Sequence, residues 1–116
     1  MILIVDDDKL VVRSITRVLK KDFTIQTASD GVEAFEYLKS PDCKCMILDI
    51  KMPRINGIEL LMLMQAEGIK LPVIVMAGFS DFTAKELKAF PNVVQFFQKP
   101  FEIEDMLEVV KKCTSN

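Results

Sequence analysis

The sequence predicts a doubly wound α/β domain, in which five alternating helices cover both faces of a five-stranded parallel sheet. Short aliphatic runs recur along the chain, and each is followed by a segment whose apolar residues repeat at helical spacing. Strands that alternate with helices in this way favour right-handed crossovers and therefore a parallel sheet. The 116 residues, half of them hydrophobic, suit a single domain over 1–116 with its own core.

The first half of the chain contains three predicted strands and two predicted helices. Ile2–Val5 is wholly aliphatic and ends in three aspartates, which is typical of a strand buried on both faces. Segment 23–28 alternates apolar and polar residues like an edge strand, whereas 46–48 is apolar throughout. Helical periodicity follows each of the first two strands. The predicted elements of this half are strands 2–5, 23–28 and 46–48 and helices 9–20 and 32–39.

The second half continues the same alternation. A loop bracketed by Pro53 and Gly57 follows the third strand and precedes a stretch rich in Met and Leu. Asp81 is a candidate N-cap for the fourth helix. The last helix has acids in its first turn and lysines in its last turn, which matches the helix dipole. The predicted elements of this half are strands 72–77 and 93–97 and helices 58–66, 81–89 and 102–112.

Charge and cysteine content narrow the class of protein. Fifteen basic and seventeen acidic residues leave a net charge of −2, which gives no footprint for direct nucleic-acid binding. The apolar runs are too short to cross a membrane, and no leader pattern precedes the first strand, so we expect a cytoplasmic protein. With no histidine in the chain, the three cysteines predict no zinc site. We expect Cys43 and Cys45 to be reduced packing residues that face the same side.

Charged residues follow three of the predicted apolar strands. Asp6 and Asp7 follow the first strand, Asp49 follows the third, and Lys99 follows the fifth. In open parallel sheets the carboxyl ends of the strands meet at one edge, where ligands bind. Clustered carboxylates are tolerated there when a cation offsets their charge, and Mg²⁺ prefers such oxygen ligands. The pattern therefore predicts a Mg²⁺ site with a neighbouring lysine, whereas Asp8 is interpreted as a helix cap.

The segments that carry these residues resemble the signatures of response-regulator receiver domains of two-component signalling. They are Ile2-Leu3-Ile4-Val5-Asp6-Asp7-Asp8, Leu48-Asp49-Ile50-Lys51-Met52-Pro53 with Asn56-Gly57, and Lys99-Pro100-Phe101. Their order and spacing match over essentially the whole chain. The resemblance implies the CheY-like, flavodoxin-like strand order 2-1-3-4-5.

The resemblance also implies a function. Asp49 would accept a phosphoryl group from a phosphohistidine on a sensor histidine kinase or phosphotransfer protein, and would be ionised and need no base. Asp6, Asp7, Asp49 and the backbone carbonyl of Lys51 would hold Mg²⁺, and Lys99 would contact the phosphoryl oxygens. The protein would be a phosphoacceptor rather than an enzyme, and would act on an output domain or partner protein.

One position departs from the family pattern. Receiver domains usually have Thr or Ser at the end of the fourth strand, where Ala77 stands here, followed by Gly78. In the family this hydroxyl moves toward the phosphoryl group, and an aromatic residue on the fifth strand, here Phe96, follows it. We therefore expect phosphorylation to persist while the conformational response weakens, since the lost hydrogen bond is worth about 1.5 to 3 kcal/mol.

Two alternatives stand beside this interpretation. Asp6-Asp7-Asp8 also fits the Asp-x-Asp pattern of haloacid dehalogenase-like aspartyl phosphatases, but the following Lys9-Leu10 and the missing Ser or Thr on the fourth strand do not. The other alternative is an adaptor that keeps the receiver fold and signals without phosphate. Ala77 favours it, whereas the intact Asp49 and Lys99 do not.

Overall fold

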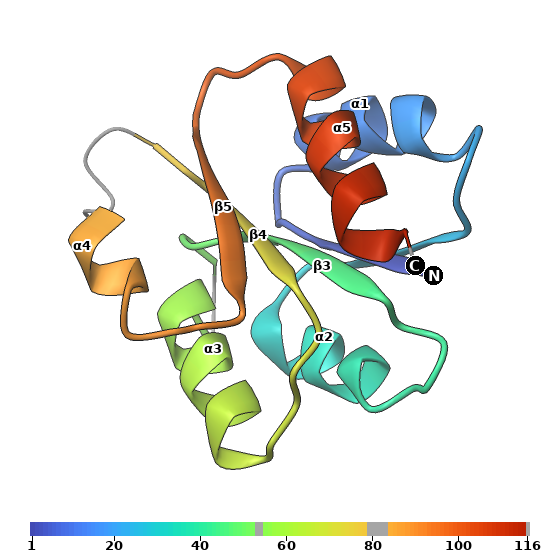
Figure 1. Cartoon of the computed structure of the whole chain (residues 1–116). Coiled ribbons are helices and arrows are strands. Elements are labelled where there is room, and N and C mark those ends of the chain that lie inside the picture. The colour runs from blue at the N-terminus through green and yellow to red at the C-terminus, as the bar shows by residue number, and fades with distance from the viewer. Residues whose placement is uncertain (53–54, 79–83, 116) are drawn as a thin grey trace.

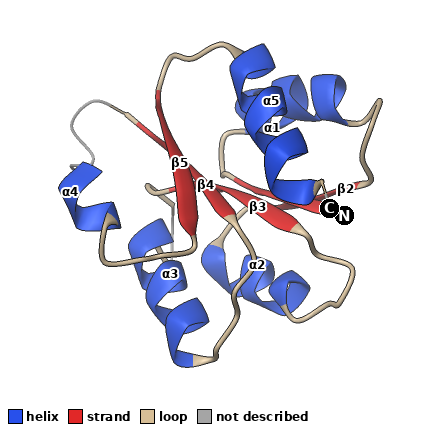
Figure 2. Ribbon diagram, viewed as in Figure 1, coloured by secondary structure: helices blue, strands red, loops and turns tan. Residues whose placement is uncertain are grey.

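The computed structural model describes residues 1–52, 55–78 and 84–115, and these form an α/β domain around one parallel sheet (Figures 1 and 2). The strand order is β2-β1-β3-β4-β5, as predicted. All neighbouring strands pair in parallel, with a register irregularity between β4 and β5 near Val73. The strands are β1 Ile2–Val5, β2 Ile25–Ala28, β3 Cys45–Asp49, β4 Val73–Ala77 and β5 Val93–Gln98.

Helices cover both faces of this sheet, which confirms the doubly wound architecture. Two helices that contact each other, α1 and α5, lie on one face, and the other three lie on the opposite face (Figure 1). The helices are α1 Lys9–Leu19, α2 Gly31–Leu38, α3 Gly57–Ala66, α4 Ala84–Leu87 and α5 Ile103–Thr114. No helix in the described part of the chain is both long and apolar enough to cross a membrane.

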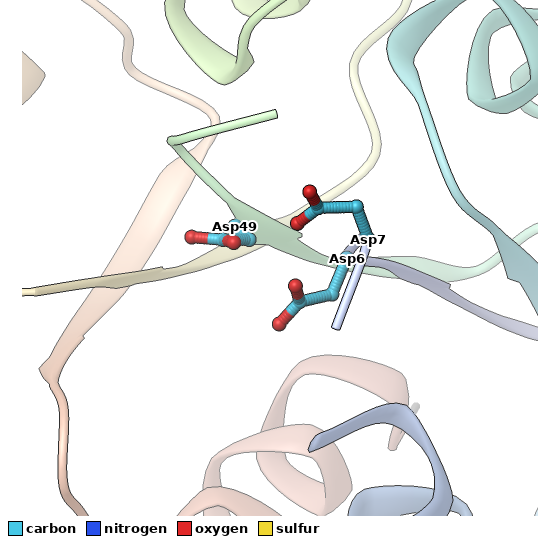
Figure 3. A group of neighbouring side chains, drawn as sticks. All are labelled: Asp6, Asp7 and Asp49. Carbon is cyan, nitrogen blue, oxygen red and sulfur yellow. The ribbon is translucent and has the colours of Figure 1, made fainter. Parts of the chain in front are cut away.

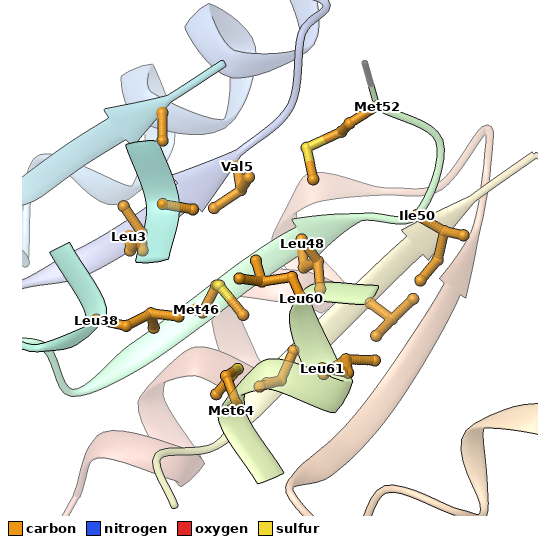
Figure 4. Packing of buried hydrophobic residues seen from close by; sticks show 14 of the residues in the cluster. Leu3, Val5, Leu38, Met46, Leu48, Ile50, Met52, Leu60, Leu61 and Met64 are labelled. Carbon is orange, nitrogen blue, oxygen red and sulfur yellow. The ribbon is translucent and has the colours of Figure 1, made fainter. Parts of the chain in front are cut away.

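The core is divided in two by the sheet. All residues of β1, β3 and β4 are buried, and alternate side chains point to opposite faces. Leu3, Met46 and Leu48 pack with α2 and α3 on one face (Figure 4), whereas Ile4 and Ile47 join the cluster under α1 and α5. Because these strands are apolar on both sides, the polar chemistry is confined to their ends.

Side-chain caps fix where several helices begin. Asp8 accepts hydrogen bonds from the backbone N–H groups at the start of α1, which confirms its predicted role. Asp30 caps α2 in the same way. Asn56 and Glu59 form a reciprocal capping box at the start of α3. The capped helices follow β1, β2 and β3, so the caps also set the loops at the carboxyl edge of the sheet.

Two boundaries depart from the predictions for reasons that the backbone hydrogen bonds show. The strand predicted over 23–28 begins at Ile25, because the Phe23 N–H donates to Leu19 O at 3.0 Å and closes the end of α1 instead. Of the fourth helix, predicted over 81–89, the structure describes α4 Ala84–Leu87, which ends at Leu87 rather than at residue 89; the expected cap Asp81 lies outside the described residues. The Phe90 N–H donates to Leu87 O, which ends α4 in a tight turn.

The cysteines are free, as expected, but Cys43 and Cys45 do not face the same side. Both are buried, Cys43 in the cluster under α2 and α3 and Cys45 in the cluster under α1 and α5. The same-side prediction was wrong because Cys43 precedes β3: its N–H donates to Ser40 O at 3.2 Å, in a turn.

Candidate functional site

Three aspartates meet at the carboxyl edge of the sheet. β1 and β3 are neighbours with Val5 opposite Leu48, so the next residues, Asp6 and Asp49, are brought side by side. Asp7 completes the group (Figure 3). One carboxylate oxygen from each aspartate lies within 4.8 Å of the other two. The structure thus brings together the three carboxylates predicted to gather at this edge.

Lys99 reaches the same group from the far side of β4. Its backbone N–H donates to Ala77 O at 2.8 Å, which fixes the end of β5 against the end of β4. Its Nζ lies 3.4 Å from Asp6 Oδ2 and 3.5 Å from Asp49 Oδ2. The ammonium therefore bridges two buried carboxylates. An oxygen-rich cluster with one cation at its side fits a hard divalent ion such as Mg²⁺.

Local hydrogen bonds orient the two buried carboxylates. The Asp8 N–H donates to Asp6 Oδ1 at 2.9 Å, and the Lys51 N–H donates to Asp49 Oδ1 at 3.4 Å. Asp6 and Asp49 are 2% and 4% exposed, whereas Asp7 is exposed to solvent. The site is therefore anchored on its buried side and open on the side of Asp7.

Burial and charge act against ionisation of Asp49. Desolvation is the largest cause, and the adjacent Asp6 adds to it, so that the pKa of Asp49 rises from 3.8 to about 7 although Lys99 and Lys51 oppose the rise. Burial also opposes the charge on Lys99, but attraction to Asp49 and Asp6 outweighs it and raises the lysine pKa. Without a divalent cation Asp49 is thus only partly ionised at neutral pH, which differs from the full ionisation expected from sequence.

Of the three residues predicted to form the switch, Ala77 and Gly78 lie at the end of β4, at the same edge of the sheet as the acidic cluster, and Phe96 lies within β5. Ala77 is fully buried at the end of β4, and Gly78 follows it half-buried. Phe96 is half-buried on β5 and packs against the same hydrophobic cluster as Ala77. The methyl side chain of Ala77 therefore occupies the position where receiver domains usually have a hydroxyl. Residues 79–83, which follow, lie outside the described part of the chain.

Two glycines near the site were not assigned a role from the sequence. A Cβ on Gly57 would lie 2.7 Å from Ile50 Cα and 3.0 Å from Asp49 O. A Cβ on Gly31 would lie 2.6 Å from Ile55 O. Both contacts are with backbone, so the loop after Asp49 is pressed against α3 and α2. The Asn56-Gly57 pair was the available signal in the sequence. The need for glycine at position 57, however, arises from its close contact with Ile50, which forms only in the folded chain.

Fold and site together define a doubly wound α/β domain with an acidic cluster and a lysine at the carboxyl edge of its sheet. Residues 2–111 match the family model for the response regulator receiver domain. The chain belongs to this family, a component of two-component signalling systems. This membership favours the receiver interpretation over the aspartyl phosphatase alternative.

Relatives and solved structures agree with this assignment. The chain is 33% identical over 107 residues to the response regulator MprA of Mycobacterium ulcerans, covering 91% of this chain and 46% of that protein. It thus spans about half the length of such relatives. The receiver domain of the Francisella response regulator 1452 has a TM-score of 0.86 and 25% identity, covering 97% and 94% of the two chains. A CheY-like receiver from Methanospirillum hungatei gives 0.85 and 25%, covering 97% and 92%.

Proposed function

We propose that Asp49 is the phosphoacceptor of a two-component phosphorelay. A carboxylate oxygen of Asp49 forms a bond to phosphorus while the N–P bond of a partner's phosphohistidine breaks, and the released imidazole nitrogen recovers a proton from solvent. The product is an aspartyl phosphate. The observation that carries the proposal is the placement of this nearly buried carboxylate within 4.8 Å of two others and 3.5 Å from Lys99 Nζ.

Asp6, Asp7 and Asp49 are the proposed Mg²⁺ ligands, together with the backbone carbonyl of Lys51. Carboxylates with one backbone carbonyl are a donor set that suits this ion, which retains water and accepts a phosphoryl oxygen in its octahedron. When bound, the ion supplies positive charge that neutralises the transferring phosphoryl group. Lys99, held against Asp6 and Asp49, is placed to pair with a phosphoryl oxygen on the opposite side.

The proposed partner upstream is a sensor histidine kinase or a phosphotransfer protein. An output domain or a separate partner protein would read the phosphorylated state. The proposal treats residues 1–116 as one receiver domain of the cytoplasm. It assigns the domain no catalytic activity beyond assisting its own phosphorylation and dephosphorylation.

Ala77 is the reason to expect a weakened conformational response. A side chain without a hydroxyl cannot donate a hydrogen bond to a phosphoryl group on Asp49, and such a bond is worth about 1.5 to 3 kcal/mol. This is comparable with the free-energy gaps of a few kcal/mol that separate switch states. The inward movement of Phe96 on phosphorylation, and any accompanying change at Gly78, would then be smaller. The same observation favours the second candidate function, a phosphate-independent adaptor.

The experiment is incubation with Mg²⁺ and acetyl phosphate, followed by intact mass measurement. We expect one phosphoryl addition that is absent from an Asp49→Asn variant and absent without Mg²⁺. Asparagine is the matched control because it keeps the shape of the side chain and removes the nucleophile. If the unmodified chain showed no phosphorylation and no Mg²⁺ binding, the proposal would be rejected and the phosphate-independent adaptor would be favoured.

The strength of the switch is tested separately with Ala77→Thr. Amide chemical shifts of residues 84–98 are compared before and after phosphorylation in both proteins. We expect larger phosphorylation-dependent changes in Ala77→Thr, because the hydroxyl restores the missing donor. A full cooperative transition in the unmodified chain would show that Ala77 does not weaken the response.

A further inference from the structure

A polar groove lies along α1, beside the acidic cluster of the proposed phosphoacceptor site. It has a volume of about 570 Å³ and runs between α1 and the segment that joins β2 to α2. Ligand sites typically measure roughly 300 to 1,000 Å³, so this groove can hold a small molecule. Asp6 belongs to the lining of the groove as well as to the acidic cluster, which places one end of the groove beside the cluster.

Three cations of α1 and a fourth at its C-cap line this groove, in a chain of net charge −2. Lys9, Arg13, Arg17 and Lys20 are spaced by four, four and three residues, so they form one stripe about 16 Å long. All four are exposed, and in the described part of the chain none lies within 4.0 Å of a carboxylate oxygen. Their charges are therefore available to a ligand.

The buried hydroxyl of Thr16 provides a second and independent observation. Thr16 lies on α1 between these cations and lines the same groove. Other helical hydroxyls bond to the carbonyl four residues earlier: Ser14 Oγ donates to Leu10 O at 2.9 Å and Thr114 Oγ1 donates to Val110 O at 2.8 Å. Thr16 Oγ1 is buried without a hydrogen-bond partner among the described residues. Because Oγ1 has almost no accessible surface, a ligand oxygen would reach it only after the Thr16 side chain rotates toward the groove, and that rotation would give the hydroxyl the partner it lacks.

We propose that this groove binds a small anion that carries several phosphate groups. Guanidinium groups bind phosphate through paired donors, and a stripe of cations suits successive phosphates better than a single carboxylate. Only Val12 and Ala28 are apolar in the lining, so the groove lacks the apolar anchor on which protein interfaces depend. It also has no aromatic side chain on which a base would stack. The ligand is recognised through its phosphates.

Two acids also line the groove and limit where the anion lies. Asp6 is paired with Lys99 and lies at the Lys9 end, where α1 begins. Glu33 belongs to α2 on the opposite wall. Cations outnumber these acids four to two in the lining, and the phosphates are placed against Arg13 and Arg17 rather than beside Asp6.

The first test is a titration with tripolyphosphate, in buffer free of divalent metal, in which binding is monitored through the amide chemical shifts of the protein. We expect saturable changes confined to residues 9–20 and 27–33. Arg13→Gln with Arg17→Gln should weaken binding about tenfold or more, since each charge-assisted hydrogen bond is worth at least about 1.5 kcal/mol. The matched control, Lys111→Gln with Lys112→Gln, removes the same charge from α5 and should leave the affinity within about twofold. Equal weakening by both pairs, or shifts spread over all lysines, would overturn the inference.

Thr16→Val tests the hydroxyl without changing charge or shape. We expect weaker tripolyphosphate binding together with an unchanged or higher unfolding temperature, because the substitution removes an unpaired polar atom. A merely structural hydroxyl would leave binding as it was, and that result would overturn the site as described.

Two further experiments test where the anion binds and whether its phosphates come from a lipid or from a soluble compound. Binding of tripolyphosphate by Asp49→Asn should equal that of the unmodified chain, whereas its loss would place the anion at the acidic cluster and overturn the inference. Sedimentation with phosphatidylglycerol vesicles, against phosphatidylcholine vesicles, separates a lipid headgroup from a soluble phosphate compound. If binding to the anionic vesicles were lost in Arg13→Gln with Arg17→Gln, the bound phosphates would be those of lipid headgroups. If that variant still bound the vesicles as tightly, the groove would not be the anion site.

Discussion

Replacing Asp49 with asparagine should stabilise the metal-free protein at neutral and alkaline pH. Asp49 is only 4% exposed, and its pKa is raised from 3.8 to about 7 by desolvation and by Asp6. Between pH 3.8 and 7 the folded protein keeps a proton on Asp49 that the unfolded chain loses. The free energy of unfolding therefore falls as the pH rises through this window.

The size of this effect follows from the two pKa values. At about 1.4 kcal/mol per pKa unit, ionised Asp49 destabilises the folded protein by about 4 kcal/mol above pH 7. Asp49→Asn removes this penalty while keeping the shape of the side chain. We expect the variant to be more stable than the unmodified chain by up to about 4 kcal/mol at pH 8, and the two proteins to converge near pH 4.

Urea unfolding followed by circular dichroism from pH 4 to 9, without divalent metal, measures both curves. Mg²⁺ should narrow the gap at pH 8, because only the unmodified chain keeps the full set of proposed ligands. The narrowing should be about 1.4 kcal/mol at a free Mg²⁺ concentration about ten times Kd. If the unmodified chain showed no loss of stability between pH 4 and 7, or if Asp49→Asn followed the same curve, the electrostatic argument would be refuted.

Three further substitutions test the surroundings of Asp49. Gly57→Ala should lower the free energy of unfolding by about 1 to 3 kcal/mol in urea, because its Cβ would lie 2.7 Å from Ile50 Cα. Asn56→Ala should lower it by about 1 kcal/mol through loss of the α3 cap, again measured by urea unfolding. Lys99→Gln should raise the pKa of Asp49 further, measured by carboxyl-carbon NMR titration, and should slow phosphorylation by acetyl phosphate, measured by intact mass.

Each of these has an outcome that contradicts it. Unchanged stability in Gly57→Ala would mean that the loop after Asp49 yields to a methyl group at no cost. If Asn56→Ala lowered the free energy of unfolding no more than an alanine substitution at an exposed polar residue elsewhere on a helix, the cap would not contribute to stability. A lower Asp49 pKa in Lys99→Gln would reverse the sign of the lysine's effect.

The sheet and its acidic edge were predictable because they depend on local patterns. Apolar runs such as those of β1 and β4 are buried on both faces, and any charge that follows them must lie at a sheet end. Parallel pairing brings Asp6 beside Asp49 once β1 and β3 are neighbours, and that strand order was implied by the family resemblance rather than by local pattern. The convergence of Lys99 on the same edge follows from the same rule, although its distances to the two carboxylates do not.

The features that sequence reasoning missed depend on contacts that exist only in the folded chain. Phe23 has a strand-like pattern, yet its N–H closes the end of α1. The tight fit of Gly57 against Ile50 exists only once the loop is folded. The pKa of Asp49 was missed for the same reason: full ionisation is expected of an aspartate in water, whereas desolvation and the neighbouring Asp6 act only in the folded site.

These electrostatics connect stability with the proposed function. The fold holds Asp49 and Asp6 together out of water, with one lysine between them, so the metal-free site is left with excess negative charge. Anything that brings positive charge to this edge relieves the penalty, and the gain appears as binding free energy. Under the proposed function, the same burial that destabilises ionised Asp49 therefore strengthens Mg²⁺ binding and aids the ionisation that phosphoryl transfer requires. Asp49→Asn should raise stability and abolish phosphorylation together, because both effects arise from one carboxylate.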